Sequence, residues 1–64
     1  MTLGKNIKNK RQDLGLSQSE LAKMAKISVS YLSEIENERT NPSLKTLLRI
    51  AEALKVNISE LVRP

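Results

Sequence analysis

Residues 14–22 read Leu-Gly-Leu-Ser-Gln-Ser-Glu-Leu-Ala, and they mark the boundary between two helices. Gly15 stands where the residue after a helix end turns left-handed, a conformation that glycine adopts without steric cost. Ser17 and Glu20 have the spacing of a capping box, in which each side chain accepts a hydrogen bond from the other residue's backbone N–H. The leucines on either side of the box occupy the two places of a hydrophobic staple. One helix therefore ends before Gly15, and a second helix begins after Ser17.

Apolar residues recur at helical spacing along the whole chain, and no segment alternates as a half-buried strand does. We therefore expect an all-α fold in a single domain, residues 1–64, with five short helices. The predicted helices cover residues 3–14, 18–25, 29–37 and 43–54, and a last one runs from an N-cap at Asn57 to residue 62. The residues predicted to face inward are Leu3, Ile7, Leu14, Leu21, Ala22, Ala25, Leu32, Ile35, Leu44, Leu47, Leu48, Ala51 and Leu54.

The second and third predicted helices lie very close together in the sequence. Ser28 is a further N-cap candidate, and Ile27 and Leu32 flank it at staple spacing. Two helices joined by a turn of about three residues cannot lie side by side in parallel, so they cross at a steep angle. This is the arrangement of a helix-turn-helix motif.

The amino-acid composition indicates which kind of molecule the protein binds. Eleven Lys and Arg oppose seven Asp and Glu, which gives a formal net charge of +4. The resulting pI of about 9.8 fits a polyanionic partner. The chain contains one Tyr and no Phe or Trp, so it lacks the aromatic platforms on which many single-strand and RNA binders stack bases.

Several classes of function are disfavoured by what the sequence lacks. Without Cys or His there are no disulfides and none of the usual zinc ligand sets, and we expect neither a metal nor a cofactor. The absence of a Gly-rich phosphate loop and of an obvious carboxylate pair argues against an enzyme. No segment has the apolar length of a membrane span or the pattern of a signal peptide, so we expect a cytoplasmic protein that does not contact membranes. No small-molecule ligand is indicated.

Three separated motifs resemble the helix-turn-helix family of phage repressors, Cro proteins and their bacterial relatives. The motifs are residues 14–22, Ile35-Glu36-Asn37 and Asn41-Pro42-Ser43-Leu44, and the likeness extends from about residue 3 to residue 62. The resemblance implies a lambda-repressor-like domain whose second and third helices form the helix-turn-helix. It also implies a transcriptional regulator that binds double-stranded DNA, with a repressor acting as a homodimer on a two-fold operator as the leading expectation.

The chain departs from the family pattern at three helix ends. Relatives often carry Gly there, whereas this sequence has Lys26, Glu38 and Lys55. A left-handed conformation at a residue other than Gly costs roughly 1 kcal/mol. The departures affect local turn geometry and leave the predicted fold intact.

In a helix-turn-helix protein, residues near the start of the second helix of the motif reach base edges in the major groove. The base-contacting candidates are Ser28, Val29, Ser30, Ser33 and Glu34. The predicted helix has no Lys or Arg, so it lacks the bidentate contact between Arg and guanine. Serine hydroxyls can bond to several base edges, Val29 can touch a thymine methyl, and Glu34 can accept from cytosine. The alternative is that Ser28 is only a cap and that Ser30 and Ser33 are merely solvated.

A second set of residues is predicted to hold the DNA backbone. Gln18 opens a helix whose N-terminal N–H groups favour an anion, and the family resemblance implies a phosphate contact there. The other phosphate-contacting candidates are Tyr31, Asn37, Arg39, Thr40 and Asn41. For Arg39 a solvated loop charge is the alternative. Five further cations (Lys5, Lys8, Lys10, Lys45 and Arg49) are interpreted as solvating charges.

Two charged residues lie on otherwise apolar stripes. Arg11 follows Ile7 by four residues, and Glu36 follows Leu32 by four. A buried charge needs a partner. The family resemblance implies an ion pair between Arg11 and Glu36, which would tie the first helix to the third; the alternative is that each lies at the solvent edge.

A homodimer would need a surface on the fourth and fifth helices. The candidates are Ile50, Ile58, Leu61 and Val62, although Leu61 fits the core better. The same scaffold can also act as a protein-interaction module, for example as an antitoxin, because a fold does not fix a function. The low charge of the third helix leaves this alternative open.

Overall fold

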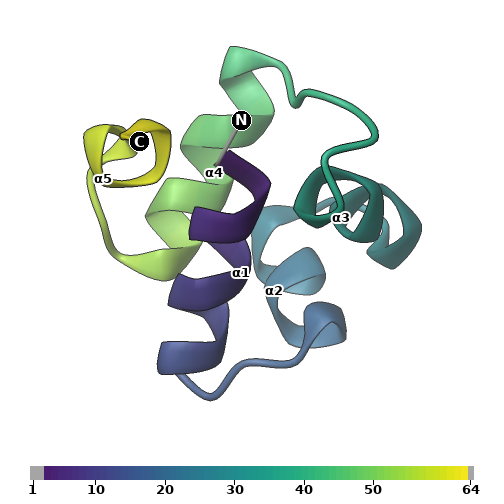
Figure 1. Cartoon of the computed structure of the whole chain (residues 1–64). Coiled ribbons are helices and arrows are strands. Elements are labelled where there is room, and N and C mark those ends of the chain that lie inside the picture. Colours follow the sequence, from purple (N-terminus) through teal and green to yellow (C-terminus); the bar gives the residue numbers. More distant parts are fainter. Residues whose placement is uncertain (1–2, 64) are drawn as a thin grey trace.

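The computed structural model describes residues 3–63 as five helices with no strand among them. The helices are α1 (Leu3–Asp13), α2 (Gln18–Ala25), α3 (Val29–Glu36), α4 (Leu44–Leu54) and α5 (Ile58–Val62). In Figure 1, α5 lies on one side of α1, and α2 and α3 lie on the other. The predicted all-α fold is confirmed, and each helix agrees with its predicted range to within a residue at either end.

The helix starts are fixed by side-chain caps. Ser17 Oγ accepts from the Glu20 N–H at 3.0 Å, and Glu20 Oε1 accepts from the Ser17 N–H at 2.8 Å, so the predicted capping box is present. The backbone N–H and the hydroxyl of Ser17 lower the pKa of Glu20 below its ordinary value of 4.5. Ser28 Oγ accepts from the Tyr31 N–H at 3.0 Å. These bonds satisfy N–H groups that a helix start otherwise leaves without partners.

Three helices end at residues in the left-handed region without glycine. Lys26, Glu38 and Lys55 have φ angles of 60°, 59° and 59°, and Gly15 has a φ of 71°. The Ile27 N–H donates to the Ala22 carbonyl at 3.0 Å across the first of these turns. The predicted turn positions are therefore correct, and three of them carry the cost of a Cβ in this conformation.

The core is aliphatic and draws on all five helices. Its fully buried large side chains are Ile7, Leu21, Leu32, Ile35, Ile50, Leu54 and Leu61. At Gly4, a Cβ would lie only 2.8 Å from the Glu36 carbonyl oxygen. The absence of a side chain at this position therefore lets α1 pack closely against the end of α3.

Three predicted core leucines are instead exposed. Leu14 is 46% exposed because α1 ends at Asp13 and the chain has already turned. On α4 the buried apolar stripe comprises residues 47, 50, 51 and 54, the spacing of one helix face, and Thr46 is buried beside them. Leu44 and Leu48 lie off this stripe and are 67% and 50% exposed. The prediction followed apolarity alone and made the α4 stripe too wide.

Of the dimer candidates, Ile50 was wrong, and Leu61 lies in the core, the placement that the sequence favoured for it. Ile50 is fully buried and Leu61 is 1% exposed, so neither can form an outer surface of this chain. Ile50 follows Leu47 by three residues on the buried stripe of α4, and Leu61 is the inward residue of α5. No helix within residues 3–63 is long and apolar enough to cross a membrane.

Candidate nucleic-acid interface

Helices α2 and α3 form the steep two-helix unit that the short turn predicted (Figure 1). The turn combines the left-handed Lys26, the half-buried Ile27 and the N-cap Ser28. The Ile27 side chain packs against the core and so holds the turn in place. The angle between the two helices is therefore held by both backbone geometry and packing.

Helix α3 has one buried side and one open side. Leu32 and Ile35 are 0% and 1% exposed, so the helix is seated firmly on the core. Ser28, Ser30 and Glu34 are exposed, and Val29 is 43% exposed. Four of the five base-contacting candidates thus lie on the open side of the chain.

Ser33, the fifth candidate, is less available. It is half-buried, and its Oγ accepts from Asn37 Nδ2 at a long 3.4 Å. Position 33 therefore lies at the boundary between the open side of α3 and its packed side.

The loop after α3 carries most of the predicted phosphate contacts. Asn37, Arg39 and Asn41 are exposed, and Thr40 is half-buried. The Arg39 N–H donates to the Glu34 carbonyl at 2.9 Å, so the loop folds back over the last turn of α3. These groups therefore follow the open side of α3 directly.

Tyr31 differs from the other phosphate candidates. It is half-buried and packs against the core, whereas the loop residues beyond α3 do not. Its ring is thereby held at the side of α3.

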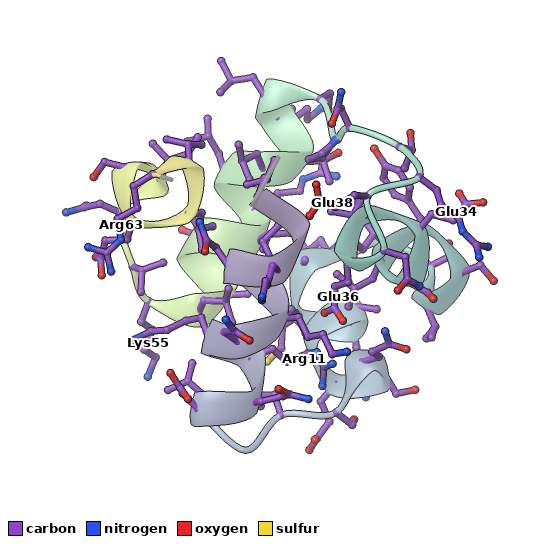
Figure 2. All side chains as sticks on the ribbon, viewed as in Figure 1. Arg11, Glu34, Glu36, Glu38, Lys55 and Arg63 are labelled. Carbon is purple, nitrogen blue, oxygen red and sulfur yellow. The ribbon has the colours of Figure 1, made fainter. Side chains whose placement is uncertain are left out.

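The predicted pair of Arg11 and Glu36 is confirmed. Arg11 Nε donates to Glu36 Oε2 at 2.8 Å, and Nη2 donates to Oε1 at 3.0 Å, a bidentate geometry. Figure 2 shows the two side chains meeting between α1 and the end of α3. The residues are 8% and 6% exposed, so the alternative of two solvent-edge charges is wrong. Arg11 Nη1 also donates to the Leu16 carbonyl at 2.9 Å, which adds the loop before α2.

One contact of this cluster was missed by the sequence reasoning. Gln18 Nε2 donates to Glu36 Oε1 at 3.0 Å, so the side chain predicted to contact phosphate already has one partner. The positions are 18 apart in sequence, and only the packing of α2 against α3 brings them together. Nothing in the local sequence pattern signals this contact.

Two lysines interpreted as solvating charges lie near the site. Lys5 and Lys8 of α1 line a hollow together with Glu36, Asn37 and Glu38 at the end of α3. Since α3 itself carries no Lys or Arg, positive charge near the interface comes from other parts of the chain, among them the turn before α3 with Lys26, the loop after α3 with Arg39, and α1.

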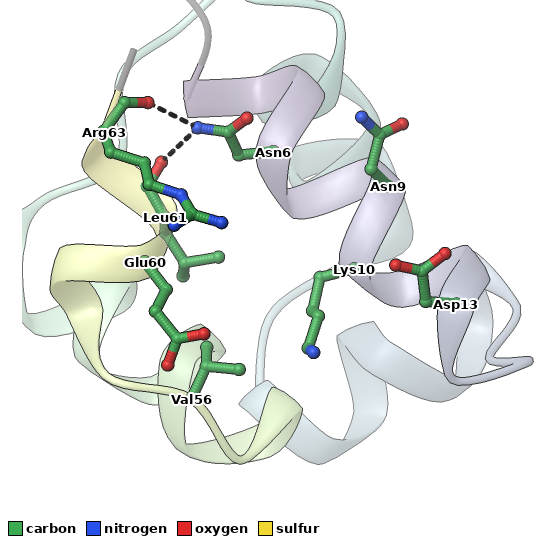
Figure 3. A pocket seen from close by; sticks show the side chains of 8 residues that line it. All are labelled: Asn6, Asn9, Lys10, Asp13, Val56, Glu60, Leu61 and Arg63. Carbon is green, nitrogen blue, oxygen red and sulfur yellow. Dashed lines mark hydrogen bonds between the residues drawn. The ribbon is translucent and has the colours of Figure 1, made fainter.

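A second hollow lies between α1 and α5, and hydrogen bonds from Asn6 hold these two helices together beside it. Asn6 Nδ2 donates to the carbonyl oxygens of Leu61 at 2.9 Å and Arg63 at 2.8 Å (Figure 3). These two bonds tie the C-terminal end of the described chain to α1. They also satisfy carbonyl groups that the end of α5 leaves open.

Apolar surface remains exposed at α4 and α5. A groove between these helices is lined by Leu48, Val56 and Ile58, with Arg49 and Glu52 alongside. Val62 of α5 is 52% exposed. Of the dimer candidates, Ile58 and Val62 therefore remain available at the surface.

Comparisons with known proteins agree on one family. The family described as helix-turn-helix matches residues 7–61. The chain is 47% identical over 62 residues to the immunity repressor protein of Bacillus phage phi105, covering 97% of this chain and 43% of the relative. It is 43% identical over 61 residues to the HTH-type transcriptional regulator SinR of Bacillus subtilis, covering 94% and 55%. The chain thus spans about half the length of these curated relatives.

Solved structures are similar over nearly the whole chain. The N-terminal DNA-binding domain of SinR from Bacillus subtilis is 38% identical, with a TM-score of 0.91, over 98% of this chain and 93% of that chain. The P22 c2 repressor in complex with a synthetic operator is 30% identical, with a TM-score of 0.90, over 95% and 92%. The fold predicted from the sequence is therefore that of phage repressor domains.

Proposed function

The chain belongs to the helix-turn-helix family of Cro- and repressor-type transcriptional regulators, which are not enzymes, and on that premise we propose that it binds duplex DNA in a sequence-specific manner through the open side of α3. The observation that carries the proposal is the outward edge formed by Ser28, Val29 and Ser30. This edge sits on a helix that is capped at its start and buried along its opposite side. A rigid helix of this kind fits the major groove.

The chemistry of the edge implies a particular mode of readout. Two serine hydroxyls and a valine methyl group offer adaptable hydrogen bonds and apolar contact with thymine. Without an Arg–guanine contact, specificity rests more on water-mediated contacts and on DNA shape. Glu34 contributes only where a cytosine amino group faces it, because phosphates repel a carboxylate.

Phosphate contacts would set the register of the helix in the groove. The side chains proposed for this role are Gln18, Tyr31, Asn37, Arg39, Thr40 and Asn41. Gln18 lies at the start of α2, Tyr31 lies at the side of α3, and the other four follow the last turn of α3. Contacts on two flanks orient a recognition helix without reading sequence themselves.

We further propose a repressor that acts as a homodimer on a two-fold operator. A single small domain neutralises few phosphates, and two copies on half-sites about one helical turn apart increase affinity. The surface proposed for the second copy is the apolar groove of α4 and α5, lined by Leu48 and Ile58, together with the exposed Val62 of α5. The names of the relatives, which include an immunity repressor, support the repressor role.

Selection of binding sites from a random DNA pool at low salt tests the function. We expect an enriched motif made of two inverted half-sites whose centres lie about 10 base pairs, one helical turn, apart. Ser30→Asp should abolish binding to the selected site. Lys55→Gln gives the same change in net charge on the opposite side of the molecule from Glu34 and should bind nearly as wild type (Figure 2).

The dimer surface is tested separately by sedimentation. Leu48→Glu should leave the chain monomeric, whereas Leu14→Glu alters a leucine of similar exposure away from the groove and should not change self-association. Equal sedimentation of both variants and the wild-type chain would refute this surface.

A protein-interaction role is the second candidate, because the open side of α3 carries Glu34 but no basic residue. An antitoxin-like module would use the same open side on a protein partner. Selection that enriches no DNA motif, even at low salt, would favour this candidate over the proposed function.

A further inference from the structure

The carboxylate of Glu36 accepts three hydrogen bonds from two different helices. Two come from the Arg11 guanidinium of α1, at 2.8 and 3.0 Å, and the third comes from Gln18 Nε2 of α2, at 3.0 Å. The Glu36 side chain is 1% exposed. Arg11 alone already provides a bidentate, oppositely charged partner, so charge compensation does not require the contact with Gln18.

The chemistry of the two groups fixes which end of the Gln18 amide faces inward. A carboxylate paired with Arg is ionised and can only accept hydrogen bonds, so it must face the NH₂ group and not the carbonyl oxygen. An amide nitrogen carries two hydrogens, and Glu36 uses one of them. The second hydrogen remains on a side chain that is half-buried at the first position of α2.

The location of this amide matters for an anion. Gln18 is the first residue of α2, where backbone N–H groups and the helix dipole favour negative charge. An amide can stabilise a phosphate only through its nitrogen, because its carbonyl oxygen repels phosphate oxygens. A freely rotating Gln presents either end, whereas one held by Glu36 has its nitrogen fixed in place.

We propose that Glu36 is a positioning residue for DNA binding: its carboxylate orients the Gln18 amide so that the second N–H donates to a backbone phosphate. The proposal rests on the proposed DNA-binding function and deepens it. Glu36 is itself inaccessible to DNA, and its effect on DNA affinity acts through Gln18. A purely structural Glu36 would stabilise the fold without any special dependence of affinity on position 18.

A double-mutant cycle on DNA affinity separates the two roles. In Glu36→Gln the new amide turns its oxygen toward Arg11 and its NH₂ group toward position 18, so Gln18 must turn its nitrogen away. We expect the Kd for the selected operator to rise roughly tenfold, the loss of one charge-assisted hydrogen bond. In a Gln18→Ala background, Glu36→Gln should change the Kd by less than about twofold, because there is no amide left to orient.

The charge change needs its own control. Glu36→Gln removes one negative charge, which by itself favours DNA binding. Asp13→Asn makes the same change in charge at an exposed residue near the end of α1. The Kd of Asp13→Asn therefore measures the effect of the charge change alone. The salt dependence of binding gives a further check. The wild-type protein and Gln18→Ala should have the same slope of log Kd against log salt, since a neutral amide releases no counterion. All affinities are compared at a temperature at which circular dichroism shows each variant fully folded.

A second measurement needs no variant at position 36. In the wild-type protein, the NMR signal of one Gln18 amide hydrogen should lie downfield of its position in an unstructured peptide, because this hydrogen is bonded to the Glu36 carboxylate. On addition of operator DNA, the other hydrogen should shift most. Gln18 amide signals that lie where those of an unstructured peptide lie, and that do not move on DNA addition, would overturn the proposal.

The outcomes separate the proposal from its premise. If the wild-type chain binds operator DNA but Glu36→Gln weakens binding equally with the native Gln18 and in the Gln18→Ala background, the positioning role is wrong and the proposed function stands. If the wild-type chain selects no DNA, the proposed function fails and the positioning role fails with it. A large effect only where Gln18 is present supports both.

Discussion

At the scale of single residues, the left-handed lysines are the clearest cost in this fold. Lys26 and Lys55 have φ angles near 60°, where a Cβ is strained and glycine is not. We expect Lys26→Gly to stabilise the protein by about 0.5–1 kcal/mol, the strain relief reduced by the larger entropy of an unfolded glycine. For a domain this small, the corresponding rise in Tm is roughly 2–8 °C.

Lys23→Gly provides the control for this prediction. It makes the same substitution within α2, where glycine costs about 1 kcal/mol in a helix interior, so its Tm should fall. A Tm of Lys26→Gly below that of the wild type would mean that the lysine side chain provides a stabilising contact that outweighs the strain.

Gly4 presents the opposite case, in which glycine is required for space. Ala is the better helix former by about 1 kcal/mol, so propensity alone predicts that Gly4→Ala is stabilising. A Cβ there would press on the backbone carbonyls of Ile35 and Glu36, which cannot move independently of α3. We therefore expect a net destabilisation of about 1–3 kcal/mol in urea unfolding, as for overpacked sites.

The matched variant for Gly4 is Asn9→Ala, an exposed position on the same helix. It should be neutral or slightly stabilising, because only propensity changes. If Gly4→Ala behaved in the same way, the close approach of α1 to the end of α3 would not limit the packing.

At the scale of elements, the start of α2 depends on pH. The Ser17 backbone N–H and hydroxyl hold the pKa of Glu20 below 4.5 in the folded protein. A carboxyl group with a lowered folded pKa contributes stability above its unfolded pKa and loses this contribution as pH falls through the folded value. Stability should therefore fall below about pH 4.5, as Glu20 is protonated and its bond to the Ser17 N–H weakens.

Thermal unfolding of wild type and Glu20→Gln between pH 3 and pH 7 measures this contribution. The wild type should be the more stable at pH 7, and the difference should shrink toward pH 3, since Glu20→Gln does not titrate at this site. Parallel curves at all pH values would show that the charge of Glu20 does not strengthen the capping box.

The elements show where sequence reasoning succeeds. Caps are local: Ser17, Ser28 and the left-handed positions place the helix ends because the relevant atoms lie within four residues of one another. The direction of a helix face is less local. The α4 stripe was predicted too wide because Leu44 and Leu48 are apolar, and only the neighbouring helices determine which side is covered.

In the candidate site, too, local features could be predicted from the sequence and contacts between helices could not. The open side of α3 follows from a short turn and a periodic pattern, both of which are legible in sequence. The ion pair of Arg11 with Glu36 was inferred from the family resemblance and not from spacing. The third bond, from Gln18, depends on how two helices pack and has no sequence signal.

In the whole molecule, positive charge lies outside the helix that is proposed to read bases. The chain has a net charge of +4, yet α3 carries only carboxylates as charged groups. Apart from Tyr31, the side chains proposed to contact phosphates therefore lie outside α3, the helix proposed to read bases. Affinity should consequently respond to salt through residues outside α3, chiefly the loop after it and the lysines of α1.

Arg39 provides the sharpest test of this separation. If it neutralises one phosphate, Arg39→Gln should reduce the magnitude of the slope of log affinity against log salt by about 0.9 and weaken binding to operator and to unrelated DNA alike. The measurement is a fluorescence titration of both DNAs across a range of salt concentrations. Lys55→Gln removes the same charge at the end of α4 and should leave the slope unchanged. Equal slopes for wild type and Arg39→Gln would mean that Arg39 is a solvated loop charge, and the lysines of α1 would then have to supply the missing phosphate contacts.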